Sequence, residues 1–108
     1  MRRVIIESPF AGATEAETAA NVAYARERMR DSLDRGEAPF ASHLLLTQVL
    51  DDTIPEQRER GIEAGLAWGA VAELSAVYTD RGISPGMALG IARAEREGRR
   101  VIYRSLRK

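Results

Sequence analysis

The sequence predicts a three-layer α/β domain with a mostly parallel sheet of about four to five strands. Short apolar runs, of which Val4-Ile5-Ile6 is the first, alternate along the chain with longer segments that carry helix start signals. These helical segments are long enough for right-handed crossovers, which make neighbouring strands parallel. The chain has 108 residues, the usual size of one domain, so we expect one domain over residues 1–108.

The N-terminal third of the chain predicts a strand followed by a long helix. Val4-Ile5-Ile6 is an apolar, β-branched run that predicts a strand over residues 2–7, and the turn residues Ser8-Pro9-Phe10-Ala11-Gly12 follow it. A capping box at Thr14-Glu15-Ala16-Glu17 predicts a helix from about residue 15. Gly36 is at the position where a glycine commonly follows the last residue of a helix, so we expect the helix to end just before it. The apolar stripe of the helix is expected to consist of Val22, Ala25, Met29 and Leu33.

The middle of the chain predicts a second short strand and a second helix. Residues 38–41 form the strand, with Pro39 near its start or on an edge strand, whereas residues 42–52 carry no clear pattern. Thr53-Ile54-Pro55-Glu56 has the form of a capping box with an early proline, which predicts a helix over residues 55–70. Its inward stripe is expected to be Ile62, Leu66 and Gly69, with Trp68 beside it. Glycines recur every four residues on this helix, which indicates close approach of a neighbouring element, at Gly61, Gly65 and Gly69.

The C-terminal third predicts a strand, a capped helix and a last strand. Residues 74–79 form the strand, and the loop over residues 80–86 ends in the helix cap Ser84-Pro85. The helix is expected to end at Gly98, and residues 101–103 form the last strand. The apolar face of the helix is expected to comprise Met87, Gly90, Ile91 and Ala94.

Composition excludes several classes of protein. Hydrophobic residues are 44% and charged residues 30% of the chain, which is typical of a globular domain. Net charge is zero and no apolar run is long enough to span a membrane, so we expect neither a nucleic-acid nor a membrane partner. There are no cysteines and His43 is the only histidine, so we expect no metal, no cofactor and a cytoplasmic location.

Three loops hold the candidate functional residues. Ligands of parallel α/β sheets bind outside the carboxyl ends of the strands. In this chain that rule selects residues 8–12, residues 42–43 and residues 79–86.

The loop over residues 79–86 offers groups for an anion and for a sugar. Ser84 and Gly86 begin a helix, whose free backbone N–H groups suit phosphate or carboxylate, although an ordinary helix cap has the same sequence. Asp80, at the end of a strand, is placed to accept hydrogen bonds from sugar hydroxyls, or is a simple turn residue.

The other two loops offer polar and aromatic contacts. Ser8 supplies a hydroxyl, Phe10 an apolar wall, and Gly12 room for close backbone approach; the alternative is a turn with Phe10 in the core. His43 is either an acid–base or ligand contact, or a local hydrogen-bonding residue. The candidate ligand-binding residues are Ser8, Pro9, Phe10, Gly12, His43, Asp80, Ser84, Gly86 and Met87.

The order of these motifs resembles the nucleoside 2-deoxyribosyltransferase superfamily, which includes deoxynucleoside monophosphate N-glycosidases and short bacterial and phage members. The resemblance rests on Ser8-Pro9-Phe10 after the first strand, residues 78–92, and Gly98-Arg99-Arg100-Val101. It implies a flavodoxin-like or Rossmann-like fold over residues 1–108, with a pocket for a nucleoside or nucleotide. It also implies a homo-oligomer, a dimer or larger, with pockets near the interface.

One departure from the superfamily bears on catalysis. The enzymes carry a nucleophilic glutamate in a Glu-Leu-Gly pattern, and aligning Leu89-Gly90 with that pattern places Ala88 at the nucleophile. Alanine cannot attack a sugar, so we expect a protein that binds a nucleotide-type molecule without turnover. A phage-type sponge that sequesters an immune-signalling nucleotide is one version. The alternative is an N-glycosidase or deoxyribosyltransferase that uses another carboxylate, Glu63 or Asp80. A purely structural or partner-binding role is the third possibility.

Overall fold

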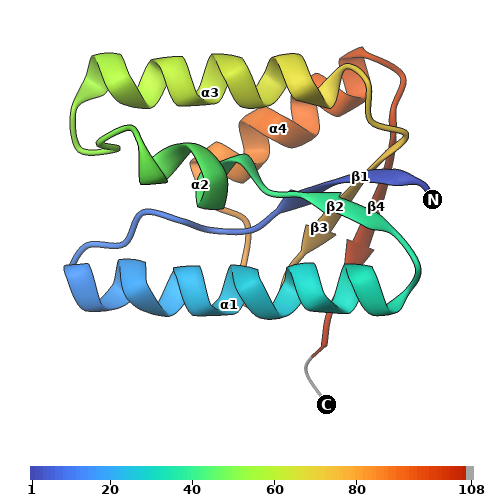
Figure 1. Ribbon diagram of the computed structural model, residues 1–108, viewed down its shortest axis with the longest axis horizontal. Helices are drawn as coiled ribbons and strands as arrows, with labels where there is room; N and C mark the ends of the chain where they lie inside the picture. Colours follow the sequence, from blue (N-terminus) through green and yellow to red (C-terminus); the bar gives the residue numbers. More distant parts are fainter. Residues whose placement is uncertain (107–108) are drawn as a thin grey trace.

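A four-stranded, all-parallel sheet in the order β2-β1-β3-β4 forms the centre of the protein in the computed structural model, which describes residues 1–106 (Figure 1). The strands are β1 (Arg3–Glu7), β2 (Ala38–Phe40), β3 (Leu74–Tyr78) and β4 (Arg100–Arg104). The helices are α1 (Glu15–Asp34), α2 (Ser42–Leu45), α3 (Pro55–Gly69) and α4 (Pro85–Arg96), with a 3-10 turn η1 (Leu46–Gln48) after α2. The predicted α/β class with a parallel sheet is confirmed.

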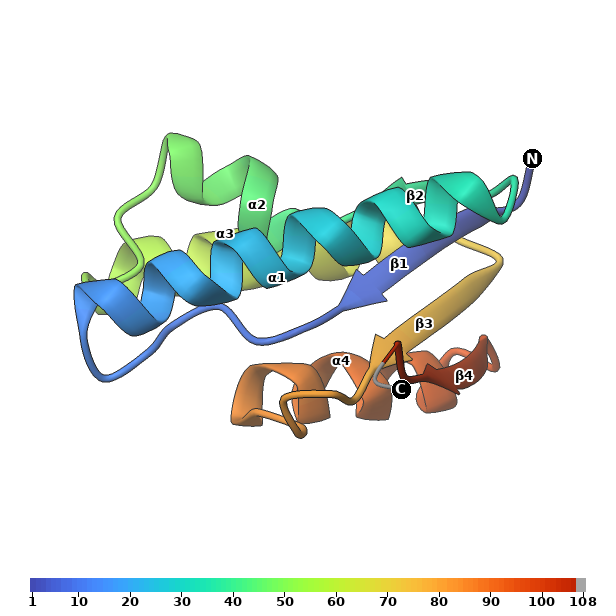
Figure 2. The same ribbon diagram turned by 90° about the horizontal axis from the view of Figure 1, so that it is seen from below.

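Helices cover both faces of this sheet. Helix α1 lies on one face, and α3 and α4 lie on the other (Figure 1). The view in Figure 2 shows α1 beside β1 and α4 beside β4. The chain first moves from β1 outward to β2 and then returns to β3 on the other side of β1. The carboxyl ends of β1 and β3 therefore flank the switch point, where α/β sheets bind ligands.

Burial in β1 alternates from one residue to the next, as expected for a strand. Val4 and Ile6 of β1 are almost fully buried and belong to a core cluster with Tyr24 of α1. Alternate residues of a strand point to opposite faces, so Ile5 and Glu7 face the side of α4. All five residues of β3 are buried because helices cover that strand on both faces.

The buried face of α1 differs from the predicted apolar stripe. Ala25 is buried, but Leu33 is 50% exposed, and the other buried residues of this helix are Asn21, Tyr24 and Ser32. The prediction was wrong at Leu33 because buried polar side chains here find hydrogen-bond partners. The Asn21 amide donates to the carbonyl of Phe10, and the Ser32 hydroxyl donates to Glu37.

Helix ends agree with the local signals at most positions. The Thr14 hydroxyl accepts a hydrogen bond from the N–H of Glu17, and Ser84 caps α4 with Pro85 as its first residue. The capping box predicted at Thr53 is wrong. Ile54 precedes α3 without a side-chain cap, and the Thr53 hydroxyl donates instead to Asp51.

The glycines of α3 mark a close contact, as predicted. A Cβ added at Gly65 would lie 2.7 Å from Oγ and 2.8 Å from Cβ of Ser42 in α2. Glycine at this position therefore lets α2 approach α3 directly. None of the helices in residues 1–106 has the length and apolarity that a membrane crossing requires.

Candidate functional site

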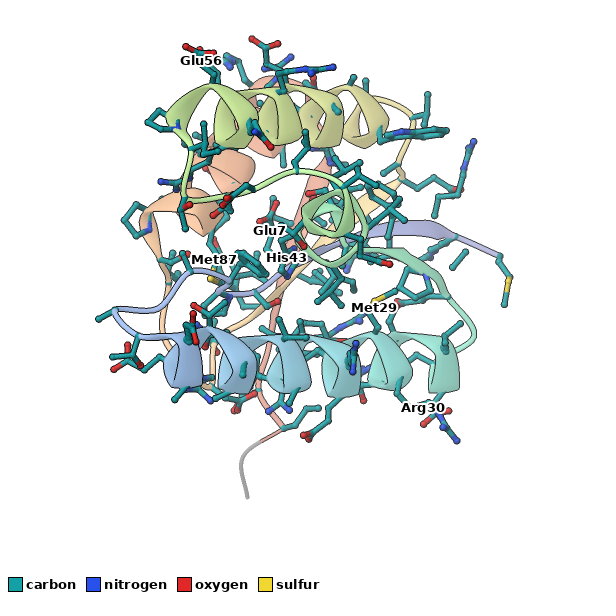
Figure 3. All side chains as sticks on the ribbon, turned by 60° about the vertical axis from the view of Figure 1, so that its left-hand side comes forward. Glu7, Met29, Arg30, His43, Glu56 and Met87 are labelled. Carbon is teal, nitrogen blue, oxygen red and sulfur yellow. The ribbon has the colours of Figure 1, made fainter. Side chains whose placement is uncertain are left out.

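A cavity of about 380 Å³ opens at the carboxyl end of β1, between the loop after that strand, α2, the start of α3 and the start of α4. Its volume is in the range of small-molecule sites. Residues from all three predicted loops line it, namely Ser8, Phe10, His43, Ser84 and Gly86, together with Met87 of α4. Figure 3 labels three residues of its lining, Glu7, His43 and Met87, close together in the middle of the molecule.

Ser8 and His43 form a polar pair in the wall of the cavity. Ser8 Oγ lies 2.7 Å from His43 Nε2, and the Phe10 ring meets the imidazole edge-on with 6.5 Å between ring centroids. Burial lowers the pKa of His43 to about 4, so the imidazole is neutral at pH 7. A neutral imidazole has one donor and one acceptor nitrogen. The pair thus presents hydroxyl and ring groups of fixed orientation without a net charge.

Glu7, the last residue of β1, adds a carboxyl group to the same cavity. Burial raises the pKa of Glu7 to about 7, and the positive charge of Arg99 opposes this rise. The carboxyl group contacts α4 at Gly90, where an added Cβ would lie 2.6 Å from Cδ and 2.8 Å from Oε1 of Glu7. We did not predict Glu7 from the sequence. The sequence did contain a signal for it: Glu7 is a charged residue at the end of an apolar strand, and the carboxyl ends of parallel strands form the ligand-binding edge of the sheet.

The start of α4 forms a second wall. The N–H of Met87 donates to Ser84 Oγ, 3.3 Å away, and the side chain of Met87 is buried. Ala88, the residue aligned with the nucleophile of the superfamily, is exposed and does not line the cavity. Helix α4 therefore turns Met87 and Gly90 inward and residue 88 outward.

The loop before α3 and the start of α3 add three polar residues to the lining. These are Asp52, Gln57 and Arg58, with 4.0 Å between Arg58 Nε and Asp52 Oδ2. We did not single out these residues as site residues from the sequence. Their place in the cavity lining depends on the path of the loop before α3, which the sequence pattern does not give.

The structure does not bring four predicted residues to the cavity. Pro9 is buried, and the N–H of Gly12 donates to Thr18 Oγ1. Glu63 is exposed on α3.

Asp80, the fourth of these residues, holds together distant parts of the chain instead. Arg28 Nη2 donates to Asp80 Oδ2 at 2.9 Å, and the Tyr24 hydroxyl donates to the same oxygen at 3.2 Å. The N–H of Leu106 donates to Asp80 Oδ1 at 3.0 Å. Within residues 1–106, no three His, Cys, Asp or Glu side chains are grouped so that they could hold a metal ion.

Solved structures that share this fold include a 2-deoxyribosyltransferase and an N-glycosidase. A 2-deoxyribosyltransferase from the psychrotolerant bacterium Bacillus psychrosaccharolyticus matches with a TM-score of 0.67 and 19% identity, over 95% of this chain and 72% of that chain. The CMP N-glycosidase BcmB of Clostridium botulinum matches with a TM-score of 0.51 and 15% identity, over 96% of this chain and 69% of that chain. The predicted similarity to the deoxyribosyltransferase and N-glycosidase fold is therefore confirmed.

Comparison of sequences places the chain in a family. No curated protein matches it. The profile of the family described as a domain of unknown function (DUF7768) matches residues 2–104, so the chain belongs to this family.

Proposed function

We propose that residues 1–108 act as one nucleoside 2-deoxyribosyltransferase-like domain that binds a nucleoside or nucleotide in the cavity beside β1. The observation that carries this proposal is the grouping of Phe10, the Ser8–His43 pair and the start of α4 around one cavity. That cavity lies at the ligand-binding edge of a fold shared with a 2-deoxyribosyltransferase and a CMP N-glycosidase. A nucleoside-type ligand is the class that this combination favours.

Each wall of the cavity matches one part of such a ligand. The Phe10 ring offers an apolar surface on which a nucleobase packs. Ser8 and His43 offer hydrogen bonds to sugar hydroxyls, and they cost little to desolvate because neither is charged at pH 7. The N-terminus of α4 at Ser84 and Gly86 offers backbone N–H groups to a phosphate.

Two versions of this function differ in the fate of the ligand. In the first, the protein holds the nucleotide intact in the cytoplasm, as a homo-oligomer, and sequesters it as a phage-type sponge would; Ala88 favours this version. In the second, the protein cleaves the N-glycosidic bond of a nucleoside or its monophosphate. The carboxyl group of Glu7 inside the cavity favours this version.

Calorimetric titration with the common nucleosides and their 5′-monophosphates tests the binding proposal. We expect at least one of them to bind, and we expect Phe10→Ala to weaken its binding by roughly 5- to 100-fold, the usual range for loss of a base–aromatic contact. Glu63→Gln is the matched control, because Glu63 is exposed and lies outside the cavity. Absence of binding by every nucleoside and nucleotide would contradict the proposal.

A further inference from the structure

Glu7, a half-buried residue, differs from two other carboxylates that lie inside the protein. Glu37 is paired with Arg104 at 2.6 Å, and Asp80 is paired with Arg28 at 2.9 Å. Within residues 1–106, no hydrogen bond or ion pair to another residue holds the Glu7 carboxyl group. An ionisable group that is largely removed from water and has no partner costs stability, and such groups concentrate at functional sites.

The groups around Glu7 leave it available to a ligand. Arg99, the charged residue that acts on it, is committed elsewhere: its Nε donates to Ser75 Oγ at 2.9 Å, and its Nη1 donates to the carbonyl of Gly69 at 2.7 Å. From α2, His43 lines the same cavity as a neutral ring. The remaining charged residues of the lining, Asp52 and Arg58, belong to the wall near the start of α3.

The absence of a side chain at Gly90 of α4 provides the space that the Glu7 carboxyl group occupies. The volume that a Cβ at residue 90 would need is filled by the end of the Glu7 side chain. Only glycine leaves that volume open. The carboxyl group thus reaches the cavity from β1, beside position 90, where α4 itself supplies no side chain.

We propose that Glu7 is the catalytic carboxylate of this cavity and cleaves the bond between the sugar and the base of the bound nucleoside. The inference rests on the proposed function, because it needs a nucleoside in the cavity. It also answers the objection raised by Ala88: residue 88 lies outside the cavity, and the carboxyl group of the cavity comes from β1 instead.

The step assigned to Glu7 is general-base hydrolysis. The carboxylate takes a proton from a water molecule, and the water oxygen bonds to the sugar carbon as the carbon–nitrogen bond breaks. The bonding electrons leave with the base nitrogen, which takes up the proton from Glu7. The net change is addition of water, and the carboxylate is regenerated. A carboxyl group whose pKa is about 7 is half ionised at neutral pH, which suits both proton transfers.

The experiment measures binding and base release separately on the same proteins. The probes are the common nucleosides and their 5′-monophosphates, with heat for binding and chromatography of the free base for turnover. We expect the wild-type protein to release base from a nucleoside or nucleotide that it binds, with a rate that rises with pH through about 7. Glu7→Gln should lower the release at least roughly 100-fold and change the affinity only a few-fold. Glu63→Gln should retain full turnover.

A second variant distinguishes a chemical role from a structural one. In the double variant Glu7→Ala/Gly90→Glu, the emptied volume receives a new carboxylate from α4, and we expect part of the turnover that Glu7→Ala loses to return. Binding without base release by the wild-type protein, or full turnover by a folded Glu7→Gln, would overturn this inference and leave the binding proposal standing. Absence of binding would overturn both.

Discussion

The carboxyl group of Glu7 on β1 lies against the backbone of Gly90 in α4 and fills the place of a side chain there. The two residues are therefore coupled: a larger residue at one position requires a smaller one at the other. Neither residue belongs to a sequence motif that makes this relationship visible.

This coupling predicts a non-additive effect on stability. In a Glu7→Ala background, Gly90→Ala has room for its methyl group and gains up to about 1 kcal/mol of helix propensity. In the wild-type background, the same change must displace the Glu7 carboxyl group, and we expect it to be less favourable by roughly 1–3 kcal/mol. Urea unfolding of the four proteins measures the difference.

A matched control for this cycle is Gly86→Ala in the same helix. A Cβ at Gly86 would come no closer than 4.0 Å to Ser84 Oγ, its nearest neighbour, and would not meet Glu7. Its effect should be the same in both backgrounds. An equal effect of Gly90→Ala in both backgrounds would show that the two residues are not coupled.

The raised pKa of Glu7 predicts that the protein loses stability as the pH rises. Its pKa is about 7 in the folded protein and 4.5 in the unfolded chain, so the folded state binds the proton more tightly. The stabilisation is fully present below pH 4.5 and is lost as the pH rises through 7, by roughly 3 kcal/mol in total. The free energy of unfolding of the wild-type protein, relative to Glu7→Gln, should therefore fall over this range. A constant difference between the two proteins would contradict the prediction.

The lowered pKa of His43 predicts the opposite dependence of stability on pH. Burial lowers its pKa from 6.5 to about 4, so the folded state resists protonation. The stabilisation is fully present above pH 6.5 and is lost as the pH falls through 4. Because His43 is the only histidine, its ring protons in an NMR titration report this pKa directly. A midpoint near 6.5 would mean that the ring is open to water.

Gly65 and Gly61 of α3 should respond differently to the same substitution. A methyl group at Gly65 would collide with the Ser42 side chain close to its backbone, so Gly65→Ala should destabilise the protein by roughly 1–3 kcal/mol. At Gly61 the nearest atom is Leu50 Cδ1 at 3.4 Å, so Gly61→Ala should be neutral or stabilise by up to about 1 kcal/mol. Thermal unfolding of the two variants tests this order, and a reversed order would contradict it.

Local signals in the sequence predicted most of the element boundaries. Ser84 and Pro85 begin α4 as expected, and Gly36 and Gly98 follow α1 and α4 with positive φ. These features depend on backbone groups within a few residues of one another, so the local sequence contains the required information. The parallel sheet followed from the alternation of strands and helices. The strand order β2-β1-β3-β4 came only from the structure.

The sequence by itself determined the strands, the three longer helices, the α/β class and the edge of the sheet where the cavity lies. It did not predict α2 and η1, which fall in residues 42–52. Only the tertiary structure decided which side chains meet there. It turned Asp80 toward Arg28, left Leu33 exposed, and brought Glu7 against Gly90. The physical reason is that burial, pKa and close contact depend on side chains from distant parts of the chain. A pattern of neighbouring residues carries no information about those partners.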